Sequence, residues 1–273
     1  MVNEPEKRSK GSTSDEITLE NVKHSLVVMS GKGGVGKSTV SANLAASLAE
    51  ETDGNVGLLD ADLHGPNIPK IMGLEDGKIS GNEDNLEPPS LGNLKVMSIG
   101  FTLPSTDSPV VWRGPLKMKA IKQFLGDVNW GDLEYLIIDL PPGTGDEPLS
   151  IAQLLSELDG SIVVTTPQDL SLLDSKKAVN FSKKLDLPVI GIIENMSGFI
   201  CPHCGEKTEI FKSGGGEEAA KEIEANFLGQ IPLDQRIVQT GDDGVPFVKA
   251  YPESEASKSF EIIVDNFKSI IGS

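Results

Sequence analysis

The residues with the clearest chemical meaning form a glycine-rich loop, Gly31-Lys32-Gly33-Gly34-Val35-Gly36-Lys37-Ser38, followed by Thr39. Its glycines let successive backbone N–H groups converge on an anion without obstruction by a Cβ atom. In such a loop Lys37 reaches the β- and γ-phosphates of a nucleotide, and the hydroxyl of Ser38 ligates Mg²⁺. The loop therefore predicts a site for ATP and Mg²⁺ over residues 31–39.

The segments on either side give the loop the context that this motif requires. Residues 26–29 are an apolar run typical of a buried strand, and Val40, Leu44 and Leu48 recur at helical spacing after the loop. A loop between strand and helix places the anion at a helix N-terminus, where the helix dipole adds partial positive charge. This context disfavours the alternative, a glycine-rich turn without chemical meaning.

Carboxylates follow two further apolar strands and suit an ion bound to the nucleotide. Asp139 ends one strand, and residues 142–145 after it form a flexible segment suited to sensing a γ-phosphate. The alternative for Asp139 is a strand-terminal residue that caps a turn. Asp60 and Asp62 end the other strand, and both can face the same cavity. One of them can hold Mg²⁺ through water while the other orients the attacking water, and their spacing leaves these roles unassigned.

The only cysteines of the chain, Cys201 and Cys204, form a Cys-x-x-Cys turn. Two thiolates at this spacing can point at one metal ion or cluster. A thioredoxin-like redox pair needs a helix after the first cysteine, whereas residues 205–211 are typical of a turn and a short strand; inert packing is a third possibility. Zinc and iron–sulfur sites usually have four protein ligands, so two copies of the chain would complete one site on a twofold axis.

Lys32 is a second lysine in the phosphate loop, and it is not needed for the phosphates that Lys37 already serves. Across a dimer interface, Lys32 can stabilise the charge that develops on a transferred phosphoryl group, as an arginine finger does. The alternative is a solvated lysine. Like the cysteine count, this residue favours a homodimer.

The elements that must position these residues alternate between strands and helices. Strands are predicted at 25–30, 56–59, 94–98, 135–138, 161–165 and 189–193, and helices at 39–50, 116–125, 148–156, 170–185, 217–225 and 257–270. This alternation predicts an α/β fold, a single-domain P-loop NTPase with a mostly parallel sheet and helices on both faces. Residues 1–22 are predicted to form a flexible polar tail, residues 23–273 the ATPase domain, and residues 77–92 a surface loop or small hairpin.

Composition excludes several other classes of protein. A net charge of −17, with 41 acidic and 24 basic residues, argues against broad contact with nucleic acid or anionic lipid. No stretch approaches about 18 consecutive apolar residues, and residues 1–22 lack the apolar region of a signal peptide. The helix predicted at 257–270 is amphipathic, but its lysines and carboxylates balance, which favours core packing. We therefore expect a cytoplasmic protein without a membrane or nucleic-acid partner.

Taken together, these segments resemble the deviant Walker A ATPases, and among them the Mrp/ApbC-type iron–sulfur carriers. Beyond the loop, the resemblance is carried by residues 60–69, 111–115, 139–146, 195–197 and 201–204, and it covers residues 24–270. It implies an ATP-hydrolysing carrier that holds a [4Fe–4S] cluster between two subunits and transfers it to apo iron–sulfur proteins. Relatives that carry an N-terminal four-cysteine motif hold a second cluster, which is not expected here.

The resemblance also implies roles for individual residues. Lys37 and Ser38 hold phosphate and Mg²⁺, while Lys32 reaches across the dimer. Asp62 controls the position of the attacking water. Asp139 contacts the ligands of Mg²⁺ and does not bind the ion directly. The remaining assignments are the cluster ligands Cys201 and Cys204 and a contact of Asn195 with the adenine.

Two alternatives remain open at this point. One is a MinD/ParA-like positioning ATPase that acts on membrane or DNA. The other keeps the ATPase and the dimer but places a structural zinc at the cysteine turn, without any delivery of a cluster.

Overall fold

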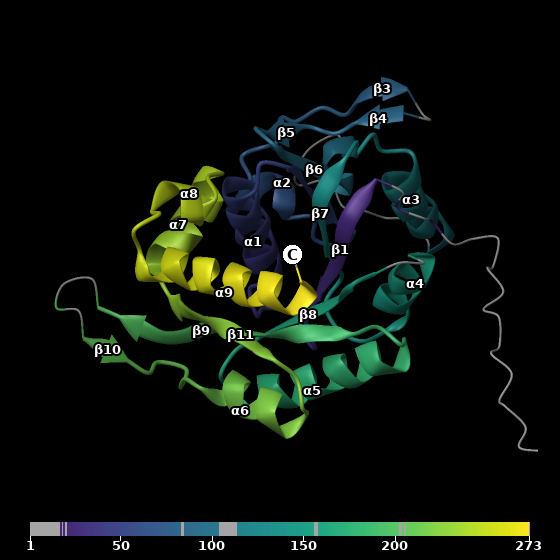
Figure 1. The fold of residues 1–273 in the computed structure, drawn as a ribbon. Helices are drawn as coiled ribbons and strands as arrows, with labels where there is room; N and C mark the ends of the chain where they lie inside the picture. Colours follow the sequence, from purple (N-terminus) through teal and green to yellow (C-terminus); the bar gives the residue numbers. More distant parts are fainter. Residues whose placement is uncertain are drawn as a thin grey trace, which may run out of the picture.

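The computed structural model describes residues 17, 19, 21–82, 85–103, 114–155, 158–201, 204 and 206–272. These residues contain a nine-stranded sheet with the order β10-β9-β8-β1-β7-β2-β6-β5, in which β11 also pairs with β9 (Figure 1). Strands β5 and β10 run antiparallel to their neighbours, and the other pairs of this sheet are parallel. The predicted single-domain α/β fold with a mostly parallel sheet is therefore confirmed.

The strands are β1 (Val22–Met29), β2 (Asn55–Asp60), β3 (Ser80–Asn82), β4 (Asn85–Glu87), β5 (Ser90–Leu91), β6 (Leu94–Ser98), β7 (Leu133–Asp139), β8 (Gly160–Thr165), β9 (Val189–Ile200), β10 (Lys207–Thr208) and β11 (Phe227–Leu233). The helices are α1 (Lys37–Glu51), α2 (Ile68–Ile71), the 3-10 helix η1 (Ile99–Thr102), α3 (Gly114–Gly126), α4 (Asp146–Leu154), α5 (Asp169–Lys184), α6 (Gly215–Glu222), α7 (Gln235–Asp243), α8 (Phe247–Ala250) and α9 (Glu255–Ile271).

Every strand and helix that hydrophobic spacing predicted is present in the structure. The predicted end of β9, however, is too early. That strand continues past residue 193 to Ile200, directly before the first cysteine. Spacing also missed β11, because Gly229 and Pro232 interrupt its apolar run. Proline is tolerated in a strand at the edge of a sheet, and β11 pairs with β9 alone. The predicted surface loop at 77–92 contains the β3–β4 hairpin.

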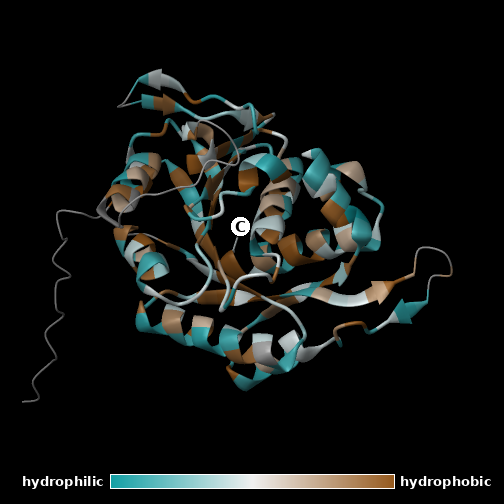
Figure 2. Cartoon of the chain, turned by 180° about the vertical axis from the view of Figure 1, so that it is seen from behind, coloured by the Kyte–Doolittle hydropathy of each residue, from teal (hydrophilic) through white to brown (hydrophobic). Residues whose placement is uncertain are grey.

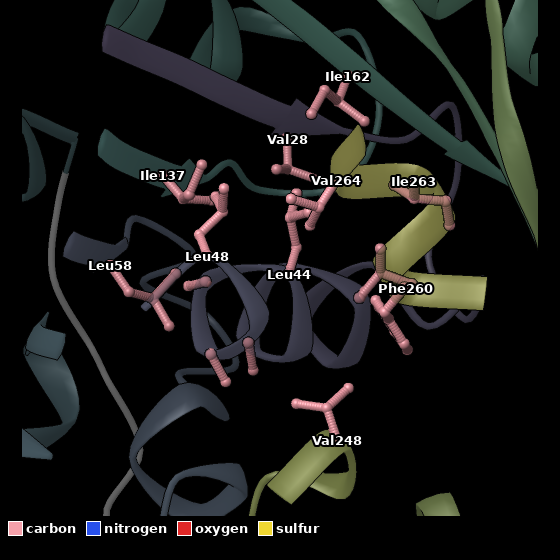
Figure 3. Packing of buried hydrophobic residues seen from close by; sticks show 14 of the residues in the cluster. Val28, Leu44, Leu48, Leu58, Ile137, Ile162, Val248, Phe260, Ile263 and Val264 are labelled. Atoms are coloured by element: carbon pink, nitrogen blue, oxygen red, sulfur yellow. The ribbon is translucent and has the colours of Figure 1, made fainter. Parts of the chain in front are cut away.

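Helices cover both faces of the sheet, and hydrophobic residues concentrate on the strands and on the inner sides of the helices (Figures 1 and 2). On one face, Leu44 of α1, Val248 of α8 and Phe260 of α9 lie in one cluster with Val28 and Ile137 of the central strands (Figure 3). On the other face, α3, α4 and α5 cover a second cluster. The predicted helical layers on both sides are therefore present.

The C-terminal helix α9 belongs to this core. Phe260, Ile263, Val264 and Phe267 are each at most 1% exposed. The apolar side of α9 therefore packs in the core. This agrees with the prediction from its balanced charges, which favoured core packing over attraction to anionic lipid. Among the residues that the structure describes, no helix is both long and apolar enough to cross a membrane.

Part of the N-terminal region predicted as a tail lies against the domain. The backbone N–H of Ile17 donates to the carbonyl of Leu154 at 2.8 Å, and Ile17 and Leu19 contact the hydrophobic cluster beneath α3–α5. The other residues of the predicted tail before residue 21, namely 1–16, 18 and 20, lie outside the described residues. The same holds for residues 111–113 of the segment that contributed to the family resemblance.

The order of the central strands gathers the predicted site at one edge of the sheet. Strand β7 lies between β1 and β2, with Val28 opposite Asp139 and Asp139 opposite Asp60. Because these strands are parallel, the loops at their carboxyl ends emerge side by side. The phosphate loop after β1 therefore adjoins both acidic segments.

Candidate nucleotide site and cysteine hairpin

The phosphate loop has the backbone conformation that its glycines permit. Gly34 and Gly36 have φ angles of 82° and 80°, in the left-handed region that favours glycine. Gly36 is also the N-cap of α1, so the helix begins directly at Lys37. The loop therefore presents backbone N–H groups at a helix N-terminus, where an anion is stabilised.

Lys37 and Asp139 form a buried ion pair beneath this loop. Lys37 Nζ lies 2.8 Å from Asp139 Oδ1, and the two side chains are 5% and 0% exposed. Asp139 also accepts hydrogen bonds from Ser38 Oγ and Ser41 Oγ, each at 2.6 Å. The buried ammonium has no well-aligned hydrogen-bond acceptor among the described residues. A buried cation with free N–H groups fits the phosphates of a bound nucleotide.

Sequence reasoning missed Ser41, although its position three residues after Ser38 on the same helix was the available signal. Its hydroxyl lies in a fully buried position and holds the carboxylate oxygen of Asp139 that also faces Lys37. The carboxylate is thereby oriented by two hydroxyls and a cation. This arrangement fixes the hydroxyl of Ser38, the predicted Mg²⁺ ligand, at the start of α1.

Asp60 and Asp62, which the sequence left with interchangeable roles, differ in the structure. Asp60 is 1% exposed and accepts hydrogen bonds from Ser98 Oγ at 3.0 Å, from the Ile68 N–H at 3.3 Å and from the Asp62 N–H at 3.2 Å. Burial raises the pKa of Asp60 well above its usual range, and the neighbouring Asp139 adds to this effect. Asp60 therefore holds the following loop in place and does not face the cleft.

Asp62 lies in that loop and lines the cleft beside the phosphate loop. Its Oδ1 accepts the backbone N–H groups of His64 at 3.2 Å and Gly65 at 3.4 Å. Partial burial raises the pKa of Asp62, and Lys37 opposes that shift. Of the two aspartates, Asp62 is the one placed to meet a ligand.

The cleft itself has a volume of about 470 Å³, which is in the range of small-molecule sites. The phosphate loop and Pro142 line one part of it, while α2 and α7 line the other. Lys70 of α2 and Asp242 of α7 form an ion pair of 3.2 Å between these two helices. Sequence reasoning missed this wall because α7 has only two hydrophobic residues, Ile237 and Val238, which are adjacent and too few to reveal a helical repeat.

Lys32 also lines this cleft, and its backbone carbonyl accepts a hydrogen bond from Ser30 Oγ at 2.9 Å. Asn195 reaches the loop from the neighbouring part of β9. Its Nδ2 donates to the carbonyl oxygen of Val35 at 2.9 Å. A Cβ atom on Gly36 would lie 2.3 Å from this nitrogen, so the amide packs directly against the loop.

The two cysteines lie on a hairpin made by β9 and β10. Ile200 pairs with Lys207, and the backbone N–H of Cys201 donates to the carbonyl of Glu206 at 3.0 Å. This hairpin projects from the body of the sheet (Figure 1). Cys201 is half-buried and Cys204 is exposed; residues 202, 203 and 205, with His203 among them, lie outside the described part.

The predicted short strand after the turn is present as β10, so Cys201 follows a strand. It does not lie at the helix N-terminus that a thioredoxin-like pair needs. Within the described residues, no group of three or more histidine, cysteine, aspartate or glutamate side chains is placed to hold a metal ion. A single chain thus presents two thiols at this position.

The sequence model of the NUBPL iron-transfer P-loop NTPases, a ParA group, matches residues 21–268. The chain belongs to this family. The predicted enzyme class, a P-loop nucleoside triphosphatase, is therefore confirmed. The predicted loop at residues 31–39 lies within the matched part of this iron-transfer P-loop NTPase.

Relatives of this iron-transfer P-loop NTPase include iron–sulfur cluster carrier proteins. An iron–sulfur cluster carrier protein of Methanocaldococcus jannaschii is 51% identical over 247 residues, which cover 90% of this chain and 84% of that protein. One from Saccharolobus solfataricus is 46% identical over 260 residues, which cover 94% and 87%. The chain thus aligns with most of the length of each.

Solved structures share the fold. A nucleotide-binding protein of Archaeoglobus fulgidus, in complex with ADP, has a TM-score of 0.72 at 42% identity, covering 83% of this chain and 88% of that one. The septum site-determining protein MinD of Pyrococcus horikoshii, complexed with Mg-ADP, has a TM-score of 0.69 at 24% identity, covering 94% and 98%. The second likeness is one of fold alone.

Proposed function

We propose that this P-loop NTPase is an ATP-hydrolysing carrier that holds a [4Fe–4S] cluster between two copies of the chain and transfers it to apo iron–sulfur proteins. The observation that carries the proposal is that one strand, β9, contacts the phosphate loop and also leads directly to the cysteines. Strand β9 supports the phosphate loop through Asn195 and continues into the hairpin that bears Cys201 and Cys204. The names of the archaeal relatives support the same class of function.

In this proposal the loop residues Gly31 to Thr39 enclose the phosphates of ATP. Lys37 binds them with its free N–H groups, and Ser38, held by Asp139, ligates Mg²⁺. When bound, Mg²⁺ would neutralise part of the negative charge on the phosphoryl group. Asp62 orients the water whose oxygen attacks the γ-phosphorus, and the bond to the leaving ADP oxygen breaks. Asn195 contacts the adenine as well as the loop.

The cluster is the cargo of this carrier. Each chain offers two thiolates and a [4Fe–4S] cluster takes four, so a pair of hairpins completes one site. Cys204 is exposed at the end of a projecting hairpin, which suits release to another protein. A pair of cysteines in the thiol form suits a reducing compartment, and we therefore place the carrier in the cytoplasm.

Anaerobic reconstitution of the full-length chain with ferrous iron and sulfide tests the proposal. We expect about four iron and four sulfide ions per two chains, with the absorbance of a [4Fe–4S] cluster. Sedimentation should give the mass of a dimer for the loaded protein. Protein that takes up zinc and no iron or sulfide would instead support the structural zinc, and nucleotide-dependent flotation with anionic liposomes would support the positioning ATPase.

A mixing experiment tests the proposed position of Lys32 across the dimer. Lys32→Ala and Asp62→Asn are each expected to lose most ATP hydrolysis. In a mixed dimer, the chain that carries Lys32→Ala retains its own Asp62 and receives an intact Lys32 from its partner. An equal mixture should therefore regain about a quarter of wild-type hydrolysis, since half the dimers are mixed and each has one complete site.

The control for this experiment is each variant mixed with itself, which should stay inactive at the same total concentration. A Lys32 that acts within its own chain would leave both sites of a mixed dimer incomplete. Absence of any recovery, with both variants shown to bind nucleotide and to dimerise, would contradict the proposed position.

A further inference from the structure

We infer that Glu194 and Asn195 couple the phosphate loop to the cysteine hairpin, so that bound nucleotide controls the accessibility of the Cys201 thiol within one chain. The inference rests on the proposed function for its purpose, because it describes how that carrier would regulate its cluster site. Its physical basis is a set of contacts made by two consecutive residues of β9. Glu194 acts as a positioning residue in this scheme.

The first contact joins β9 to the phosphate loop. Asn195 is 7% exposed, and its Nδ2 donates to the carbonyl oxygen of Val35 at 2.9 Å. The close approach of this amide to Gly36 leaves no space between strand and loop. The loop therefore cannot change its backbone conformation around a phosphate without moving or fixing the side chain of Asn195.

The second set of contacts joins Glu194, the residue before Asn195, to the segment in which the chain comes back from the hairpin. Glu194 is 0% exposed and accepts the backbone N–H of Gly214 at 2.9 Å and that of Gly216. It also accepts a hydrogen bond from Ser197 Oγ at 2.5 Å. The carboxylate thus lies at the N-terminus of α6, where a negative charge is stabilised by the helix dipole.

Between these contacts and the cysteines, the backbone of β9 bends. Met196 has a φ angle of 59°, which is unfavourable for a residue other than glycine, and Gly198 has a φ angle of 71°. The register between β9 and β11 also shifts in this region. Strand β9 remains paired with β11 as far as Phe199, so the bend lies within the strand. The chain comes back beside β9 at Gly214, where Glu194 holds the base of the hairpin together.

This arrangement predicts the direction of the coupling. A phosphate that orders the loop also fixes the carbonyl of Val35, and with it Asn195 and the base of the hairpin. A base that opens less often exposes Cys201 less often to solvent. Ordering at one site then favours the ordered form of the other, and the coupling is reciprocal by thermodynamic necessity.

The rate of thiol alkylation measures this coupling directly, since Cys201 and Cys204 are the only cysteines of the chain. The full-length, reduced chain without added iron is treated with iodoacetamide, with and without Mg-ADP or a non-hydrolysable ATP analogue. Mass spectrometry of the peptide that contains both cysteines follows each thiol. We expect nucleotide to slow alkylation of Cys201 at least about threefold, within the usual range of coupling between sites.

The informative variant is Glu194→Gln, which keeps the shape of the side chain and places an NH₂ group opposite a backbone N–H. Alkylation of this variant should be insensitive to nucleotide, while its nucleotide affinity stays within about twofold of wild type. Circular dichroism and thermal unfolding establish that it is folded. Ser197→Ala, which removes one donor to Glu194, should show an intermediate effect of nucleotide and provides a milder second variant.

The matched control is Glu222→Gln, which removes the same charge from the exposed end of α6, where Glu222 pairs with Lys176. It should keep the wild-type response. A wild-type alkylation rate that does not change with nucleotide, or a full response in Glu194→Gln, would overturn the inference. So would protection that increases with protein concentration, because it would arise from association between chains. Because alkylation is measured without a cluster, its outcome can be distinguished from a failure of the cluster reconstitution that tests the proposed function.

Discussion

Lys37→Ala is expected to lower nucleotide affinity about 100-fold, because the ammonium is the only charged donor buried beneath the phosphate loop in the described structure. The same change should lower the free energy of unfolding of the nucleotide-free protein by about 3 kcal/mol. It leaves the fully buried carboxylate of Asp139 without its cation, and only the hydroxyls of Ser38 and Ser41 remain to stabilise that charge.

Titration calorimetry with ADP and Mg²⁺ measures the first effect, and urea unfolding measures the second. The double variant Lys37→Ala, Asp139→Asn should recover most of the lost stability but none of the lost affinity, since it removes the unpaired charge and not the need for a cation. Lys70→Ala is the matched control, because Lys70 lines the same cleft but is 51% exposed. Affinity within threefold of wild type in Lys37→Ala would refute this account.

The second large effect is expected from replacing both cysteines by serine. Cys201→Ser, Cys204→Ser should bind no [4Fe–4S] cluster, because a serine hydroxyl is not deprotonated at neutral pH and the chain has no other cysteine. Nucleotide affinity should stay within about twofold of wild type, since the described lining of the cleft comes from the phosphate loop, α2, α7 and the loops beside them, not from the hairpin. Iron and sulfide analysis after anaerobic reconstitution measures the loss, and calorimetry measures the affinity.

Ser213→Ala is a suitable control for the cysteine variant. Ser213 lies on the return side of the same hairpin and donates to Glu209, so its loss perturbs the segment without removing a thiol. This control should load a full cluster. A double cysteine variant that still bound four iron ions per dimer would place the cluster elsewhere and would contradict the proposed function.

The fold followed from the sequence to a large extent, because alternating strand and helix patterns depend on residues close together in the chain. The exceptions have physical reasons. Strand β11 contains Gly229 and Pro232 and is stabilised by its pairing with β9, which no local pattern reports. Helix α7 buries only Thr240, so its position depends on contacts with α2 and α8.

The site divides in the same way. The loop at residues 31–38 and the Cys-x-x-Cys turn were predicted from the sequence alone, since both motifs depend on the spacing of neighbouring residues. Tertiary structure was needed to separate Asp60 from Asp62, because the difference lies in burial and in donors such as Ser98 and Ile68. Sequence reasoning also did not find Ser41, which meets Asp139 only after β7 packs beside α1.

The sequence by itself predicted two chemistries for this protein, at a phosphate-binding loop and at a pair of thiols, and it predicted the sheet that carries them. Only the tertiary structure decided how they are connected. Asn195 lies 160 positions from Val35 along the chain, and Glu194 is 20 positions from Gly214. Such contacts depend on which strands are neighbours and on where a strand bends, and both are settled by packing of the whole domain.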